Sequence, residues 1–239
     1  MRVLQKGYFY GAIGMLGFSL TLPATRAAVM DIDPLLVGLG RALVAAVLAL
    51  IVLLFNPRAL PTSKQWLPLA VVALGVVVGF PVLTSLAMQH VNASHGAVEV
   101  YDLMLLGGVI AAAIGYAMGA KLAKEMRSWQ VISWALVLAA PFLVMPVIVQ
   151  LSATGFNPGL ASFLGFLYVS CVSMFLAFIA WYAGLSLVGT AKIGLLQLFQ
   201  PFLTIIASAL LLGEQVSTSI VMVALLVAIT VFAGQRARV

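Results

Sequence analysis

Charged residues are scarce in this sequence: only 8% of its 239 residues are Asp, Glu, Lys or Arg, whereas 64% are hydrophobic. A soluble domain carries about 25% charged residues, so the composition excludes a soluble fold and indicates a chain that lies in lipid. The single cysteine, Cys171, excludes an intrachain disulfide. Because Cys171 lies within an apolar run, we expect a buried apolar role for it.

Motifs of the common hydrolases and nucleotide-binding enzymes are also absent. The sequence has no His-Glu-x-x-His, no Gly-x-Ser-x-Gly and no phosphate-binding loop. Tyr101-Asp102 resembles half of an intramembrane aspartyl protease site, but no second aspartate lies deep enough in another apolar run. His90 and His95 have no Cys or carboxylate at ligand spacing, so we expect no metal site. We therefore expect no enzyme and no cofactor.

Apolar runs of about 20 residues recur along the chain, each long enough to cross a hydrocarbon core about 30 Å thick. In lipid each run must satisfy its own backbone hydrogen bonds, so we expect α-helices. The runs lack the period-two alternation of a transmembrane barrel. The sequence thus predicts an all-α integral membrane protein with eight spans. They cover residues 7–30, 35–55, 66–88, 102–120, 129–151, 159–187, 193–212 and 218–234.

The charges predict the orientation of these spans. If both termini are cytoplasmic, most of the 12 basic residues lie in the inner connections, as the positive-inside rule requires. These are Arg2, Lys6, Arg58, Lys64, Lys121, Lys124, Arg127, Lys192, Arg236 and Arg238. The outer ends carry the acids Asp31, Asp33, Glu99, Asp102 and Glu214. There we expect Arg26 and Arg41 to snorkel or to pair with the acids. Since the charges lie at helix ends rather than in a patch, the net charge of +6 does not indicate a nucleic-acid partner.

The chain contains an internal duplication. Val188-Gly189-Thr190-Ala191-Lys192-Ile193-Gly194 has a counterpart in Val91-Asn92-Ala93-Ser94-His95-Gly96-Ala97. Further pairs match in the same order: Gly17-Phe18 with Gly115-Tyr116, Arg26 with Lys124, and residues 41–44 with 134–137. The pattern predicts a first repeat at 1–98 with three spans and a second at 99–239 with five. Because each has an odd number of spans, the second is inverted, which is the architecture of secondary transporters.

Three motifs carry a family resemblance: the Leu-x-x-Val-Gly-Thr-Ala-Lys turn ending at Lys192, the Gln200-Pro201 helix, and the Leu-Leu-Leu-Gly-Glu stretch ending at Glu214. They resemble the EamA-like branch of the drug/metabolite transporter (DMT) superfamily. The chain, above all 129–141 and 87–96, is most similar to the YddG-type aromatic amino-acid exporters. The resemblance implies ten spans in two five-helix repeats around a central cavity.

The sequence departs from that pattern after the first copy of the turn. Glu99-Val100-Tyr101-Asp102 leads directly into the segment that matches the sixth helix of the family. About two helices of the first repeat are therefore missing. A natural degenerate paralogue, an engineered shortening or the omission of a segment would each give this sequence.

Polar side chains within the spans are few, and two glutamines are candidates for substrate binding. Gln197 and Gln200 lie three residues apart on one face of the seventh span. Pro201 removes one helical hydrogen bond beside them, as Pro23 and Pro81 do in other spans, so we predict a helix break or hinge at each proline. The glutamine amides could bind a zwitterionic substrate or could only join helices to one another.

Aromatic residues are candidates for a cavity wall. Phe18, Ser19 and Tyr116 lie deep in two helices that correspond across the duplication. Trp181 and Tyr182 could line the same cavity or could belong to an interfacial aromatic belt.

Acidic residues are absent from the middle of every span, which argues against a proton relay of buried carboxylates. Glu99 and Asp102 would cap a helix start, or Asp102 could bind a substrate ammonium. The glycine pairs Gly7/Gly11, Gly75/Gly79 and Gly115/Gly119 indicate close helix packing.

Together these features predict a secondary carrier that exports small neutral or zwitterionic metabolites by alternating access. The resemblance to amino-acid exporters further implies that the substrates are amino acids. The alternative is a shortened membrane scaffold that does not transport. We expect a small-molecule substrate and the lipid bilayer as partners. Because two helices are missing from one side, we also expect weakened transport and self-association, for example as a homodimer.

Overall fold

The computed structural model describes residues 2–56, 60–90 and 100–212, and scattered positions beyond them. In these ranges all regular structure is helical. Six helices there are long and apolar enough to cross a membrane. They are Leu36–Phe55, Ser63–Gln89, Val100–Leu122, Ser128–Thr154, Leu160–Val188 and Thr190–Leu211. The prediction of an all-α membrane protein is thereby confirmed.

These six helices match the second to the seventh predicted spans, with ends that differ by three residues at most. The first predicted span is divided at Leu20 into α1 (Arg2–Ser19) and α2 (Thr21–Ala28). The eighth predicted span, 218–234, and the junction at 91–99, with His95 and Glu99, lie outside the continuously described residues. The count of eight spans and their division into three and five therefore remain predictions.

The division of the first span has a cause in the sequence. Pro23 has no N–H, so the carbonyl of Ser19, four residues earlier, lacks its usual helical donor. The Thr204 hydroxyl donates to that carbonyl at 2.8 Å, and the Tyr168 hydroxyl donates to the Gly17 carbonyl at 2.9 Å. Two side chains from later helices thus bond the backbone groups around the break.

The other two prolines predicted as helix breaks also follow an irregular segment. Pro81 lies at the start of α5 (Phe80–His90), directly after the π-helical segment η2 (Ala73–Gly79). Pro201 lies at the start of α11 (Gln200–Leu212), directly after the 3₁₀ segment η4 (Leu195–Phe199). A proline alone does not suffice, because α7 (Ser128–Thr154) stays α-helical through Pro141 and Pro146.

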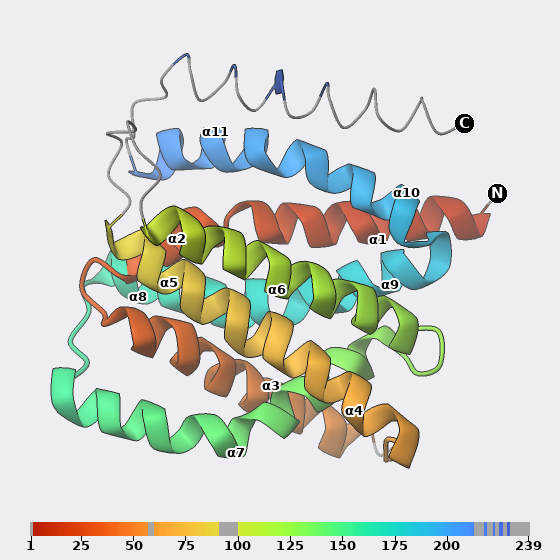
Figure 1. The fold of residues 1–239 in the computed structure, drawn as a ribbon, viewed down its shortest axis with the longest axis horizontal. Coiled ribbons are helices and arrows are strands. Elements are labelled where there is room, and N and C mark those ends of the chain that lie inside the picture. The colour runs from red at the N-terminus through yellow and green to blue at the C-terminus, as the bar shows by residue number, and fades with distance from the viewer. Residues whose placement is uncertain are drawn as a thin grey trace.

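The helices form one bundle in which successive spans run in opposite directions (Figure 1). Its central contact joins α1 to α9 (Ala177–Val188), and α11 covers α1 from outside. Next, α6 (Val100–Leu122) packs on α4 (Ser63–Val72), η2 and α5, while α3 (Arg41–Phe55) packs on α7. At one end of the bundle α2 packs on α8 (Leu160–Leu167), which continues through the π-helical segment η3 (Tyr168–Leu176) into α9.

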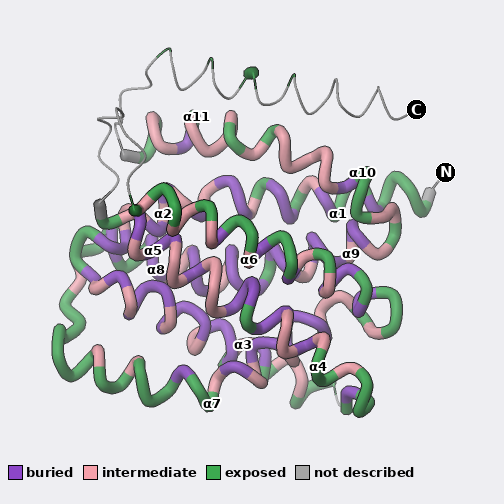
Figure 2. Tube along the Cα trace, viewed as in Figure 1, coloured by how far each residue is buried: buried purple, intermediate pink, exposed green. Residues whose placement is uncertain are grey.

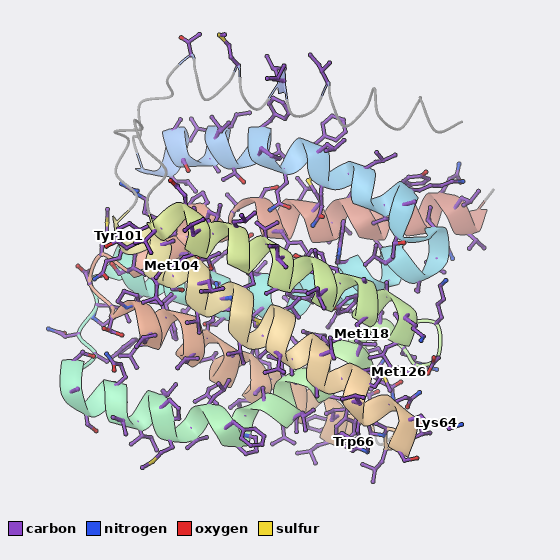
Figure 3. The ribbon with its side chains drawn as sticks, in the orientation of Figure 1. Lys64, Trp66, Tyr101, Met104, Met118 and Met126 are labelled. Atoms are coloured by element: carbon purple, nitrogen blue, oxygen red, sulfur yellow. The ribbon has the colours of Figure 1, made fainter. Side chains whose placement is uncertain are left out.

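Most of the described basic and acidic residues lie at opposite ends of this bundle, although Glu125 lies at the basic end and Arg26 and Arg41 lie toward the acidic end. The N-terminus of α1, the start of α4, the α6–α7 connection and α10 (Thr190–Gly194) lie at the end drawn on the right of Figure 1. Lys64 and Met126 are labelled at that end in Figure 3, and Tyr101 at the other. The α2–η1 loop with Asp31 and Asp33 lies at the end of Tyr101. This is the separation of charge that the orientation prediction assumes.

Glycines allow α1 and α9 to approach closely. A Cβ on Gly14 would lie 2.9 Å from the backbone N and Cα of Trp181, and one on Gly184 would lie 2.7 Å from the backbone N of Gly11. Between α6 and η2, a Cβ on Gly75 would lie 2.5 Å from the Ala111 carbonyl oxygen. Such distances leave no room for a side chain. The predicted pairs are equally crowded, since a Cβ on Gly7, Gly115 or Gly119 would come within 2.7 Å of a side chain, so the prediction of close packing at these glycines is confirmed. The tight α1–α9 contact is deep within the bundle (Figure 2).

We expect Gly14→Ala to destabilise the fold, because the added methyl group meets backbone atoms that cannot move without separating α1 from α9. Overpacking of this kind costs about 1–3 kcal/mol. Gly194→Ala is the matched control: nothing lies within 4 Å of its Cβ position, and its φ of −56° suits alanine. The thermal unfolding midpoints of the two variants in detergent check this. Equal midpoints would show that the close approach is not required.

Candidate functional site

Five aromatic rings from α1, α6 and α9 meet inside the bundle. They belong to Phe18, Tyr116, Phe178, Trp181 and Tyr182, and are called the aromatic cluster below. Ring centroids in the contacting pairs lie 4.9 to 6.0 Å apart. The closest pair, Phe18 and Phe178, meets edge to face, and Phe18 stacks on Tyr116. These are the arrangements in which aromatic rings attract one another.

Four of the seven residues predicted as substrate-binding belong to this cluster: Phe18, Tyr116, Trp181 and Tyr182. A fifth, Gln197, forms a side-chain hydrogen bond with Tyr116. Trp181 and Tyr182 are 1% and 0% exposed, so they do not form an interfacial belt. The sequence prediction missed Phe178, although it lies one helical turn before Trp181 and therefore on the same face.

The other two predicted residues, Ser19 and Gln200, lie outside the cluster. Ser19 is buried, and its hydroxyl donates to the Met15 carbonyl in its own helix at 2.8 Å. Gln200 is half-buried at the first position of α11. A role of Ser19 and Gln200 in substrate binding stays a prediction.

Polar groups within the cluster are mostly donors. The Tyr182 hydroxyl donates to the Gly115 carbonyl over a long 3.4 Å. The Trp181 Nε1–H is buried and has no hydrogen-bond partner. A buried donor without an acceptor costs roughly 1–3 kcal/mol. The cluster thus combines aromatic faces with a donor that an acceptor on a small molecule could satisfy.

A polar contact at the acidic end of the bundle joins α8 to the loop after α2. The Asp31 carboxylate accepts the Gly159 N–H at 2.9 Å and the Ser162 hydroxyl at 2.7 Å, and so caps the start of α8. These two hydrogen bonds lower the pKa of the Asp31 carboxyl. Asp33 instead caps its own helix, since its carboxylate accepts the N–H groups of Leu35 and Leu36. Asp102, in the first turn of α6, lies where a cap would.

The expectation for Arg41 was wrong. This residue neither snorkels nor pairs with the outer acids: its side chain is 1% exposed, inside the bundle. Its Nη1 donates to the Thr25 hydroxyl at 3.4 Å, while Nε and Nη2 have no partner. The reason is that α3 continues from the π-helical segment η1 (Leu36–Gly40), which α5 covers, so Arg41 lies beneath a neighbouring helix rather than at a free end.

Metal coordination has no support in the part of the chain that the structure describes. No group of three or more His, Cys, Asp and Glu side chains there could hold a metal ion.

For the aromatic cluster we expect Tyr116→Ala to impair transport more than membrane insertion, because it removes a ring that contacts Phe18, Phe178 and Trp181. Tyr116→Phe keeps these ring contacts and removes only the bond to Gln197, so it should impair transport less. Initial transport rates, normalised to the amount of protein in the membrane, check this. Unchanged kinetics in both variants would remove Tyr116 from the site.

For the contact at Asp31 we expect Asp31→Ala to lower stability at neutral pH and to remove part of the acid sensitivity. Because the folded protein holds the pKa of Asp31 below its ordinary value of about 4, the contact contributes above that pH. Its contribution is lost as the pH falls through the lowered pKa. Thermal midpoints of both proteins from pH 7 to pH 3 should therefore converge at the acid end. Parallel curves would contradict a role for the carboxylate.

Comparisons with known proteins agree with this picture of a helical transporter. The chain matches the EamA-like transporter family over residues 5–101 and again over residues 99–233. It is similar to the "Uncharacterized transporter YdeK" of Bacillus subtilis (strain 168), with 35% identity over an alignment of 285 positions that covers 99% of each chain. No solved structure matches it. Because the two family matches together span almost the whole sequence, the chain belongs to the EamA-like transporter family.

Proposed function

We propose that this membrane transporter is a secondary carrier that exports small neutral or zwitterionic metabolites, amino acids above all, by alternating access. The observation that carries the proposal is the aromatic cluster, formed where α1 of the first half meets α6 and α9 of the second. Its rings suit an apolar or aromatic side chain. Trp181 Nε1 suits an acceptor such as a carboxylate or carbonyl oxygen. The cluster itself contains no charged side chain, which favours such a solute over an inorganic ion.

Alternating access requires two halves that can rock against each other, and the helix contacts support such an arrangement. In an inverted repeat, α1 would correspond to α6, α3 to α7, and α4–α5 to α8–α9. The packing of α1 on α9 should then have its counterpart in the packing of α6 on α4–α5. Both contacts occur, and α3 packs on its own counterpart α7. This exchange of partners is what inverted repeats produce. It supports a first repeat at 1–98 and a second at 99–239.

A shortened first repeat fits the same scheme. The first family match, over 5–101, is shorter than the second, over 99–233. The alignment with the Bacillus relative runs over 285 positions, whereas this chain has 239 residues, so at least 46 positions have no counterpart here. In the second repeat α11 covers α1. No equivalent helix covers α6 in the described part of the first repeat.

The face of α6 that such a helix would cover is apolar and exposed. Its large side chains recur at helical spacing and are 52–58% exposed. They are Leu103, Leu106, Ile110 and Ile114. Lipid and a second copy of the chain both suit this face. The proposal therefore includes a homodimer.

We further propose a location in the cytoplasmic membrane with both termini in the cytoplasm. The basic end of the bundle would then face the cytoplasm, in accord with the positive-inside rule. In that orientation the Asp31 contact with α8 lies on the outer side.

Inside-out vesicles test the proposed activity. Their outer surface corresponds to the cytoplasmic face, so an exporter should accumulate labelled amino acids in the lumen, with saturable initial rates. Vesicles that contain equal amounts of the Tyr116→Ala variant are the control for background and insertion. If none of the 20 common amino acids is taken up saturably, the amino-acid assignment is wrong.

The competing function is that of a membrane scaffold without transport, which the exposed face of α6 favours. Solute binding distinguishes the carrier from the scaffold, because a solute that binds the folded state must raise the stability of that state by RT ln(1 + [L]/Kd). A scaffold would show no thermal shift with any metabolite and no uptake. A carrier slowed by its missing helices would still show the shift.

A further inference from the structure

Arg41 is the one described residue whose charge lies inside the bundle with most of its hydrogen-bonding capacity unused. It is 1% exposed, and it lies within the membrane-spanning helix Leu36–Phe55. Only Nη1 has a partner, the Thr25 hydroxyl at 3.4 Å, and Nε and Nη2 have none. Arginine stays ionised in proteins, and a buried charge without compensation is costly. A group that carries the opposite charge is therefore expected here at some stage of the working cycle.

Among the residues that the structure describes, no acid is found against the Arg41 guanidinium. The buried residues of η1, α8 and η3 include the apolar Val37, Phe166 and Val169. The buried hydroxyls of Ser170 and Ser173 in η3 carry no charge and are engaged with the Phe166 carbonyl and Thr21. The nearest acids in sequence, Asp31 and Asp33, are engaged by the N–H and hydroxyl groups that they cap. An anionic ligand is thus the natural partner for Nε and Nη2, which belong to the same planar fork that binds carboxylates with two parallel hydrogen bonds.

Two further features of the surroundings favour a ligand at this position. The π-helical segment η1 ends directly before Arg41, and π-helical turns within α-helices occur frequently at functional sites. Ser85, on α5, is fully buried and its hydroxyl has no partner. Because α5 packs on both η1 and α2, a second unsatisfied donor lies on an element that borders Arg41.

The placement of Arg41 relative to the aromatic cluster sets the length of such a ligand. Phe18, Thr21 and Thr25 follow one another at one-turn spacing along α1 and α2. Phe18 belongs to the aromatic cluster, Thr21 bonds Ser173 at 2.8 Å, and Thr25 bonds Arg41. At a rise of 1.5 Å per residue, Phe18 and Thr25 are about 10 Å apart along the axis. A ligand that reaches both Arg41 and the rings must therefore bridge an interval of this order.

We propose that Arg41, assisted by Thr25, binds the carboxylate of the transported solute while the aromatic cluster binds its apolar part. The proposal rests on the proposed transport function and narrows its substrate class. Substrates are small organic carboxylates with an apolar group, zwitterionic amino acids included. Organic amines and uncharged metabolites are excluded. Thr25 acts as a positioning residue, because it holds one arm of the guanidinium and leaves the other two nitrogens for the ligand.

Thermal protection of the purified full-length chain in detergent tests this. The probes are L-phenylalanine, 3-phenylpropionate, which keeps the carboxylate and lacks the amine, and L-phenylalaninamide, which keeps the amine and lacks the carboxylate. We expect the two carboxylates to raise the unfolding temperature and the amide to have no effect. Arg41→Gln should weaken carboxylate binding by about tenfold or more, as expected for a charge-assisted hydrogen bond. For Arg41→Lys, which keeps the charge without the planar fork, the carboxylate affinity should lie between the affinities of the wild type and Arg41→Gln.

Two controls separate this role from a structural one. Lys64→Gln removes a positive charge from an exposed position at the basic end and should leave protection unchanged. Without any probe, Arg41→Gln should unfold at the same temperature as the wild type or higher, because it removes an uncompensated buried charge. If Arg41→Gln instead fails to fold or unfolds at a much lower temperature, Arg41 has a structural role and the proposal is overturned.

The outcomes also distinguish this proposal from the proposed function. If L-phenylalanine and its amide protect equally, and Arg41→Gln changes neither, an amino-acid carrier remains and the Arg41 site is wrong. If 3-phenylpropionate raises the unfolding temperature of the wild type but not of Arg41→Gln, and no amino acid binds or is transported, the Arg41 site is supported and the amino-acid assignment is wrong. Absence of protection by both carboxylates at millimolar concentration overturns the site.

Discussion

The close contact between α1 and α9 is the constraint on which the rest of the structure depends. Because Gly14 and Gly184 bring the two backbones together, Phe18 on α1 meets Phe178 and Trp181 on α9 at ring distances of 4.9 and 6.0 Å. In lipid there is no hydrophobic force between helices, so small residues and the packing that they allow hold helices together. The same contact therefore joins the two halves of the chain and forms the aromatic cluster.

A second constraint is that backbone groups inside the membrane must find partners. The break at Leu20 leaves the Gly17 and Ser19 carbonyls to accept hydroxyls from Tyr168 and Thr204. Both donors come from later helices, so the break in the first span is fixed by the second half of the chain. Among the described side chains, Arg41, Ser85, Trp134 and Trp181 have buried polar groups without a hydrogen-bond partner. Such departures are expected where function rather than stability determines the residue.

The sequence allowed the second to the seventh spans to be predicted closely, because apolar runs of this length have few alternatives in lipid. It also allowed Phe18 and Tyr116 to be paired, since they correspond across the duplication, and the two rings stack. It could not decide whether Trp181 lies inside the bundle, because the helix is apolar on all sides and hydropathy does not show which side faces lipid. Arg41 was misplaced for a related reason: its position near a span end suggests snorkelling, whereas the covering helix α5 belongs to a distant part of the sequence.

The contacts between the two halves differ in how easily they can separate. Opening α1 from α9 would lose packing along the whole length of a contact that is built on backbone atoms. The Asp31 contact consists of two hydrogen bonds at an exposed side chain, where water can replace both. Between them lie the break at Leu20 and the buried charge of Arg41, close to the acidic end. The acidic end is also held by the packing of α2 on α8. In the proposed cycle of alternating access, the Asp31 hydrogen bonds would therefore be the first contact to open, with α1 and α9 remaining together as the pivot. In such a motion the groups first exposed at the acidic end would be those around Thr25 and Arg41.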